Sequence, residues 1–505
     1  MKITRWICIL LLVSLLPACA QKQPDAPATS GVPAVTAAPE DTDTTAPDPN
    51  DRSRVPDHVP DGVAFDGESL RLLYRTSDFI EKYDVVGTDN IGDYVTDGVW
   101  ARNTKVEERF GITLDTVSTD SGALAEVSSA IKQIVMSGSN EYDYIISTGN
   151  TTIVNSLNNY LRNLADLPYA DYTAPWWWDE VNRAVSLDGK TYNYIFGDML
   201  IYCYIQTGVV YYNKTLYENA YGDPEEMYKT VMDGKWTIDR MMELTSGAYV
   251  DANGNGVEDA GDIFGAMKTQ TQGEETPHFL TGFDIPMYYR EDDGHLVIEF
   301  DQERAVTAIE KISRFFSNTT GVFHSDQTID SGSAAYFAED CAIFFPARLS
   351  RVLHETFRSM TSPYGILPYP KLDEAQSEYR SLIHNSCTNI CIPKTVAEDR
   401  FTMIGAVLEA LSAESWRSVM PLFLDTALKV KYSQDQMSGQ VIDLVIAGVT
   451  KNTLEEYNSF SGGIFNSCLA TLAKTGGTNF ASTYKKALPA AQKTWDKAVA
   501  ALNAN

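Results

Sequence analysis

The sequence predicts an α/β protein in which strands and helices alternate along the chain. In its first half, residues 70–74, 112–117 and 142–146 have the composition of short buried strands, and helical patterns occupy residues 103–110 and 124–135 between them. Such alternation is typical of a mixed, mostly parallel sheet flanked by helices. With 505 residues, the chain is also long enough for two or more domains with substantial cores.

The second half of the chain carries a further set of α/β signals. Residues 236–244 have a helical pattern that Thr237 caps, and residues 288–300 form a predicted hairpin across an Asp-Asp-Gly turn. Asp301 is placed to cap the next helix, and residues 341–345 form a strand that should end before Pro346. These signals predict a second region built like the first.

An apolar run at residues 201–212 joins the two regions. It is rich in aromatic and β-branched residues, which predicts an extended strand buried on both faces. Gln206 and Thr207 interrupt the run with polar side chains, and a helical pattern opens after Asn213. A buried amide at Gln206 needs a hydrogen-bond partner or a ligand.

The first 19 residues have the features of a bacterial lipoprotein signal peptide. Lys2 and Arg5 precede an apolar run at residues 7–16, which is too short for a permanent membrane span. The sequence Leu-Pro-Ala-Cys that ends at Cys19 resembles a lipobox, with proline where a small residue is usual. We therefore expect lipidation at Cys19; the alternative is ordinary signal cleavage near Ala20.

Residues 20–61 are dominated by Pro, Ala, Thr and Asp, with almost no large apolar side chains. Such a segment buries too little surface to offset the entropy of ordering, so we expect a disordered tether. The whole chain has a formal charge of −28, which argues against nucleic acid and anionic lipid surfaces as partners.

A loop in the second half follows the register of an EF-hand calcium loop. Oxygen-bearing side chains fall at loop positions 1, 3, 5, 9 and 12, glycine stands at position 6, and position 7 would contribute a backbone carbonyl. The predicted ligands are Asp251, Asn253, Asn255, Val257, Asp259 and Asp262. The last is shorter than the usual glutamate, and the alternative is an Asp/Asn/Gly-rich hairpin without metal.

Several segments, in order, resemble the family 1 extracellular solute-binding proteins, the sugar receptors of ABC importers. Tyr212-Asn213-Lys214 matches the end of that family's first interdomain crossover, and residues 364–370 resemble the second. Residues 337–348 are similar to a stretch that leads to an aromatic facing the ligand, although the family's glycine is absent. Residues 426–445 resemble a C-terminal segment of these lipoproteins. The resemblance covers residues 68 to about 445.

This resemblance implies a two-lobed periplasmic-binding-protein-like fold with crossover hinge strands. The implied organisation is a signal peptide at 1–19, the tether at 20–61, lobe I at 62–207, lobe II with the calcium-like loop at 208–363, a return to lobe I at 364–430 and C-terminal helices at 431–505.

The predicted ligand site lies where strands end and the lobes meet. Asp78 and Asn150 follow two strands of lobe I, and such strand ends gather at one rim of a parallel sheet. The resemblance to the family implies further candidates. These are Gln206 on the crossover, Phe283, Phe345 and Arg348 in lobe II, and one of Trp176, Trp177 and Trp178. Packing or capping is the alternative role for each.

We therefore expect a lipid-anchored, monomeric binding protein on the extracellular face of a bacterial cytoplasmic membrane. It would capture a carbohydrate, an oligosaccharide, for the permease of an ABC importer, with no catalytic residues and structural Ca²⁺ as the one implied cofactor. The sequence has no nucleophile elbow, zincin motif or phosphate loop. A cell-surface glycoside hydrolase, which needs only two carboxylates, and a non-transport carbohydrate-binding surface protein remain the alternatives.

Overall fold

The computed structural model describes residues 51–89, 92–269, 275–317, 321–325, 332–425 and 436–503. Residues 1–51 and 52–505 separate into two units, and every element below belongs to the second. The predictions for Cys19 and for the tether up to residue 50 lie outside the described residues.

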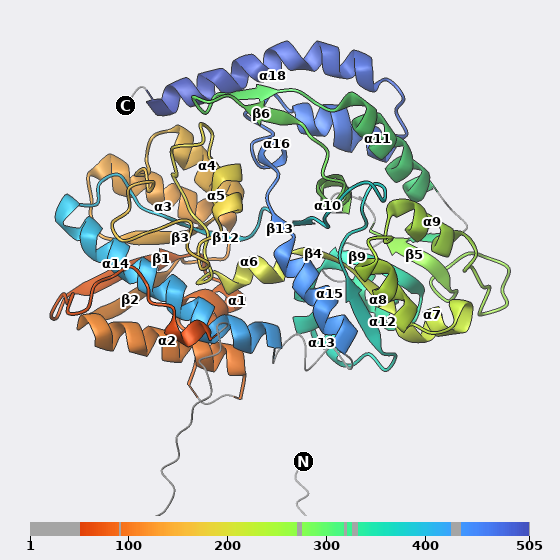
Figure 1. Cartoon of the computed structure of the whole chain (residues 1–505), viewed down its shortest axis with the longest axis horizontal. Coiled ribbons are helices and arrows are strands. Elements are labelled where there is room, and N and C mark those ends of the chain that lie inside the picture. Colours follow the sequence, from red (N-terminus) through yellow and green to blue (C-terminus); the bar gives the residue numbers. More distant parts are fainter. Residues whose placement is uncertain are drawn as a thin grey trace, which may run out of the picture. The chain divides into compact units, whose positions relative to one another are not determined.

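Lobe I is built on a four-stranded sheet in the order β12-β3-β1-β2, flanked by helices (Figure 1). β1 is parallel to β2 and β3, and β12 is antiparallel to β3. The strands are β1 (Ser69–Tyr74), β2 (Thr113–Ser118), β3 (Tyr144–Thr148) and β12 (Thr388–Cys391). The helices are α1 (Asp78–Ile80), η2 (Glu81–Val85), α2 (Tyr94–Phe110), α3 (Leu124–Ser137), α4 (Gly149–Leu157), α5 (Asp179–Ala184), α14 (Glu398–Glu414) and η4 (Ser415–Val419).

Lobe II is built on a five-stranded sheet in the order β10-β4-β9-β5-β8. β4 is antiparallel to both neighbours, whereas β5 is parallel to β8 and β9. The strands are β4 (Gly208–Asn213), β5 (Phe264–Lys268), β8 (Val322–His324), β9 (Ala342–Arg348) and β10 (Tyr364–Leu367). The helices are α7 (Lys214–Tyr221), α8 (Glu225–Met232), α9 (Ile238–Ser246), α10 (Glu275–Gly282), α11 (Gln302–Ser317), α12 (Ser333–Ala338), η3 (Leu349–Leu353), α13 (Glu355–Arg358) and α15 (Gln436–Ala447).

β9 corrects the prediction that its strand ends before Pro346. The strand continues to Arg348, with Pro346 opposite Val210 of β4. β5 pairs with β9 at Ala342 and Phe344. Pro346 lies beyond these two positions, where β9 is no longer hydrogen-bonded to β5. A residue without an N–H group is tolerated at such a position.

The joining segment is also not the single strand that the sequence predicts. Residues Ile201–Ile205 form a short helix, α6, and β4 begins only at Gly208. All five residues of α6 are buried, and a fully buried run has no periodicity that separates helix from strand.

Three chain segments run side by side where the chain passes between the lobes. Thr207 bridges Ile383, and β11 (Ser381–Leu382) is parallel to β13 (Val449–Thr450). We call Thr207, β11 with Ile383, and β13 the crossover ribbon. Ile383 N–H donates to Thr450 O, whereas the next N–H, of His384, donates to Gln206 O, so β13 and Gln206 lie on opposite edges of the central segment.

A hairpin and the C-terminal helices complete this unit. β6 (Tyr288–Arg290) and β7 (Leu296–Ile298) form the predicted hairpin, and the C-terminal elements are α16 (Thr453–Glu456), η6 (Asn466–Ala470), α17 (Thr471–Thr475) and α18 (Phe480–Asn503). The Gln492 side chain of α18 holds the hairpin, since it accepts from Ile298 N and donates to Leu296 O. Arg290 donates to the Leu187 carbonyl of lobe I at 3.1 Å.

The tether predicted to reach residue 61 ends earlier. A single helical turn, η1, spans Arg52–Arg54, and Val59 is buried. Arg109 of α2 donates to Val59 O at 2.9 Å and pairs with Asp57 at 2.7 Å. These contacts attach the segment to lobe I, which a Pro/Asp-rich composition does not reveal.

The predicted caps at Thr237 and Asp301 are confirmed. Thr237 accepts from Arg240 N at 3.2 Å, and Asp301 accepts from Arg304 N at 3.1 Å. Within the described part of the chain, no helix combines the length and apolarity needed to cross a bilayer.

Candidate ligand-binding site

Gln206 and Arg348 meet where lobe I passes into lobe II. Gln206 follows α6 directly and is buried, and its side-chain oxygen accepts from Arg348 Nη1 at 2.6 Å and from Ser386 Oγ at 3.4 Å. Arg348 ends β9 opposite Gly208, the first residue of β4. Two candidates that the sequence places in different lobes therefore form one charge-assisted hydrogen bond, which is stronger than a neutral one.

Two histidines surround this pair. The His384 ring contacts Ser386 Oγ at 2.8 Å, and its centroid lies 6.3 Å from that of His278 on α10. A Cβ at Gly208 would approach His278 Nδ1 to 2.2 Å, so glycine is required there. We call Gln206, His278, Arg348, His384 and Ser386 the crossover cluster.

Both imidazoles are held neutral. Burial, with Arg348 and Lys451 nearby, lowers the pKa of His278 to about 3, and burial likewise lowers the pKa of His384 well below its ordinary value. Among the described residues, neither ring nitrogen of His278 has a hydrogen-bond partner. A buried polar group without a partner marks a place that a ligand or water can satisfy.

A buried ion pair lies behind the cluster. Lys451 Nζ and Glu456 Oε2 are 2.9 Å apart, and both side chains are fully shielded from solvent. Glu456 also reaches the end of β3, since a Cβ at Gly149 would lie 3.0 Å from its Oε1. The pair thus connects the crossover ribbon to the strand ends of lobe I.

The strand-end residues of lobe I are placed as follows. Asp78 is exposed and begins α1, four residues after β1 ends. Asn150 is the second residue of α4, two residues after β3 ends, and its side chain lies outside the described residues. β1 and β3 are parallel neighbours, so both residues follow strand ends at one edge of the sheet.

The tryptophans pack lobe I. Trp176 and Trp177 are buried, and Trp177 Nε1 donates to Glu409 Oε2 at 2.7 Å. Trp178 is half-buried, donates to Asp198 Oδ1 at 2.6 Å and packs edge-on against Tyr204. Trp176 and Trp177 therefore offer no stacking face, because both rings are buried inside lobe I.

Phe283 and Phe345 do not provide the apolar face expected of them. Both are fully buried; Phe283 packs against Phe279 and Phe345 against Phe337. Phe345 and Arg348 are three residues apart on β9, so alternation sends their side chains to opposite faces of the sheet. Only Arg348 reaches the crossover.

Hydrogen bonds among its own residues hold the calcium-like loop in a compact turn. Asp251 accepts from Gly254 N at 2.8 Å and Gly256 N at 3.1 Å, and both glycines have positive φ. The amides of Asn253 and Asn255 converge on Asp259 at 2.9 and 2.8 Å. These hard oxygen donors are of the type that Ca²⁺ prefers.

Asp262 is engaged differently from the other loop residues. It is buried and accepts from Ala252 N and Asp259 N, each at 3.2 Å, and from the Tyr249 hydroxyl at 3.1 Å. In the described ranges, no three His, Cys, Asp or Glu side chains form a metal site. Amide and carbonyl oxygens would therefore have to complete the ligand set.

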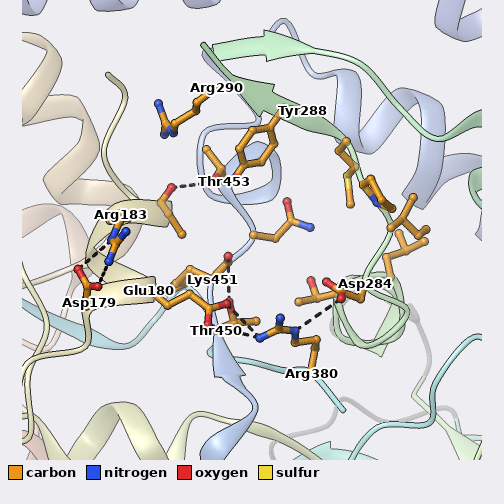
Figure 2. A pocket seen from close by; sticks show the side chains of 17 residues that line it. Asp179, Glu180, Arg183, Asp284, Tyr288, Arg290, Arg380, Thr450, Lys451 and Thr453 are labelled. Atoms are coloured by element: carbon orange, nitrogen blue, oxygen red, sulfur yellow. Dashed lines mark hydrogen bonds and ion pairs between the residues drawn. The ribbon is translucent and has the colours of Figure 1, made fainter. Parts of the chain in front are cut away.

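A separate cavity of about 770 Å³ lies on the other edge of the crossover ribbon. It is lined by α5 of lobe I, by the end of α10 and the segment after it in lobe II, and by residues 450–453. Figure 2 shows Glu180, Arg380 and Asp284 in a row along one side of this hinge-side pocket, with Tyr288 and Thr453 on another.

Comparison with known proteins identifies the fold. Neither a family model nor a curated protein sequence matches the chain. Among solved structures, UgpB from Mycobacterium tuberculosis in complex with glycerophosphocholine is similar, with a TM-score of 0.52 and 14% identity over 86% of this chain and 100% of that chain. A cyclo/maltodextrin-binding protein complexed with maltotetraose has a TM-score of 0.52 and 12% identity, over 86% and 97% of the two chains. The predicted two-lobed, periplasmic-binding-protein-like fold is confirmed.

Proposed function

We propose that this chain is a lipid-anchored extracellular binding protein that captures a carbohydrate, an oligosaccharide, for the permease of an ABC importer. The observation that carries the proposal is the buried Gln206–Arg348 hydrogen bond at the crossover between the lobes. The fold supports it, because the lobes of such proteins close around a ligand at the place where the chain passes between them.

The chemistry of the crossover cluster suits a hydroxyl-rich ligand. Gln206 offers an amide and Arg348 a guanidinium fork, and the neutral rings of His278 and His384 each carry one donor and one acceptor nitrogen. Vicinal hydroxyls both donate and accept, so they can pair with such a mixture. Of the two similar structures named above, one is in complex with glycerophosphocholine and the other with maltotetraose.

Ligand screening by thermal shift tests the function. A sugar that binds the folded state should raise the melting temperature by mass action, and its mass should be unchanged after release. Conversion of the sugar to products would favour the glycoside hydrolase instead. A shift with glycerophosphocholine alone would replace the carbohydrate by a phosphodiester.

Gln206→Ala should weaken sugar binding about tenfold or more. A buried group that loses its hydrogen-bond partner costs roughly 1–3 kcal/mol, and a tenfold change in affinity is about 1.4 kcal/mol. Calorimetry on the responding sugar measures the effect. Gln376→Ala is the matched control, because Gln376 is also a buried amide but binds the carbonyls of Gly282 and Glu378. Equal affinities in the two variants would place the ligand elsewhere.

Cys19→Ser should release the protein from membranes without changing its affinity for sugar. The serine hydroxyl cannot take the lipid that a lipobox cysteine receives, and membrane retention needs an acyl anchor or another apolar element. Fractionation of bacteria that express each form is the measurement. Retention of the serine variant in the membrane fraction would show that lipid at Cys19 is not the anchor.

We further propose that the loop at residues 251–262 binds Ca²⁺ in a structural role. Asp251, Asn253, Asn255 and Asp259 would hold the ion together with the Val257 carbonyl, and Asp262 would keep the loop closed. Chelation should lower the melting temperature, and Asp251→Ala/Asp259→Ala should remove that response while sugar affinity changes little. A chelator response that survives in the double variant would assign the ion to another place.

A further inference from the structure

The hinge-side pocket is a different place from the crossover cluster. Thr450 lines it, and Thr450 belongs to β13, the outer segment of the crossover ribbon. Gln206 lies on the opposite edge of the ribbon's central segment. The N–H of Ile383 donates to Thr450 O, whereas the next N–H, of His384, points the other way and donates to Gln206 O. A ligand at one place therefore does not occupy the other.

The walls of the pocket come from both lobes and from the ribbon between them. Lobe I contributes Glu180 and Arg183 of α5, and lobe II contributes Thr281 of α10 and residues 284–287. Its volume of about 770 Å³ falls within the ordinary range of small-molecule sites, roughly 300–1,000 Å³.

In the part of the chain that the structure describes, the charged side chains that line the hinge-side pocket already have ion-pair or hydrogen-bond partners. Arg380 lies 3.0 Å from Glu180 and 3.7 Å from Asp284. The remaining contacts are Arg183 with Asp179, Lys451 with Glu456, and Arg290 with the carbonyls of Ser186, Leu187 and Gly294. An ionic ligand would have to break one of these pairs and so lose much of what it gains.

What the pocket still offers is hydrogen bonding without net charge. Thr281 is 5% exposed, and its hydroxyl has no partner among the described residues. The paired carboxylates of Glu180 and Asp284 keep unused lone pairs, since each oxygen can accept more than one hydrogen bond. Leu280, Ile285 and Met287 add an apolar stretch to the lining.

We propose that the hinge-side pocket binds a second, uncharged and hydroxylated small molecule, a sugar or a polyol. Its hydroxyls would bond Thr281, Glu180 and Asp284, and its CH groups would lie on the apolar stretch. The unpartnered Thr281 hydroxyl is the group that such a ligand satisfies. This site goes beyond the proposed transport function and does not depend on it.

The test uses the Gln206→Ala variant, in which binding at the crossover cluster is weakened, so that binding at the hinge-side pocket can be measured separately. Full-length Gln206→Ala protein is titrated by calorimetry with glucose, maltose, maltotetraose, sorbitol and glycerol, and with glucose 6-phosphate as the charged comparator. At least one neutral compound should bind with a stoichiometry of one. Thr281→Val/Glu180→Gln, added to that background, should weaken this binding at least tenfold. Thr307→Val/Glu303→Gln on α11, where Glu303 is exposed and Thr307 half-buried, is the matched control.

Two results would overturn the proposal. One is that no neutral compound binds the Gln206→Ala protein; the other is that its binding is the same with and without the pocket substitutions. Thr281→Val preserves side-chain shape, so it serves alone if the double variant does not fold. Failure of the proposed function would look different, as a lack of binding that depends on Gln206.

Discussion

Lys451→Met should lower the free energy of unfolding by about 3–5 kcal/mol. Lys451 and Glu456 are 2.9 Å apart and both fully buried, so the substitution leaves the Glu456 carboxylate without its cation in a place that water does not reach. Removal of one member of a buried pair is costly because the other retains its desolvation penalty. Methionine approximates the length of the lysine stem, so a cavity contributes little.

Urea denaturation measures this loss, and two further variants define its origin. Lys235→Met removes an exposed lysine paired with Asp233 and should cost no more than about 1 kcal/mol. Lys451→Met/Glu456→Gln should recover part of the loss, because the uncompensated charge is gone. Equal stability of Lys451→Met and Lys235→Met would mean that the buried pair contributes nothing.

Stability should fall as the pH is lowered from 7.5 to 5, by about 2 kcal/mol from His278 alone. Burial and the neighbouring cations Arg348 and Lys451 lower the pKa of His278 from 6.5 to about 3. At a pH between these two pKa values, His278 is protonated in the unfolded chain but neutral in the folded protein. Lowering the pH therefore favours the unfolded state. His384, which faces the same cations, acts in the same direction.

His278→Phe isolates this contribution. A phenyl ring keeps the packing against Tyr369 but cannot take a proton, so the variant should lose less stability than the parent over the same pH range. Parallel pH profiles of the parent and His278→Phe would contradict the assignment.

Local signals in the sequence were enough for much of the fold. The caps at Thr237 and Asp301 are predictable because each side-chain oxygen accepts from the N–H group three residues later, an arrangement that depends on the local sequence alone. The strand β1 follows from its apolar composition, and the helix α3 follows from its helical pattern. The helix at residues 201–205 could not be predicted, since burial on all sides erases that periodicity.

The candidate site was predicted only where family pattern and burial coincided. The sequence places Gln206 on the crossover and Arg348 in lobe II, and in the structure their side chains form a hydrogen bond. His278, His384 and Ser386 were missed because they reach Gln206 through tertiary contacts from distant segments. One signal was available: glycine after Gln206-Thr207 in an apolar strand indicates that another group approaches the backbone, and that group is His278.

The order of strands along the chain determines the order in which the two sheets can be completed. All five strands of the lobe II sheet lie between Gly208 and Leu367, in one stretch of chain. The lobe I sheet begins at Ser69 but receives its edge strand only at Thr388–Cys391. During synthesis the N-terminus emerges first, so the lobe I sheet is started first and completed last, and the edge of β3 stays unpaired while the lobe II sheet forms. Until β12 is in place, the edge of β3 is where an incomplete chain can pair with another.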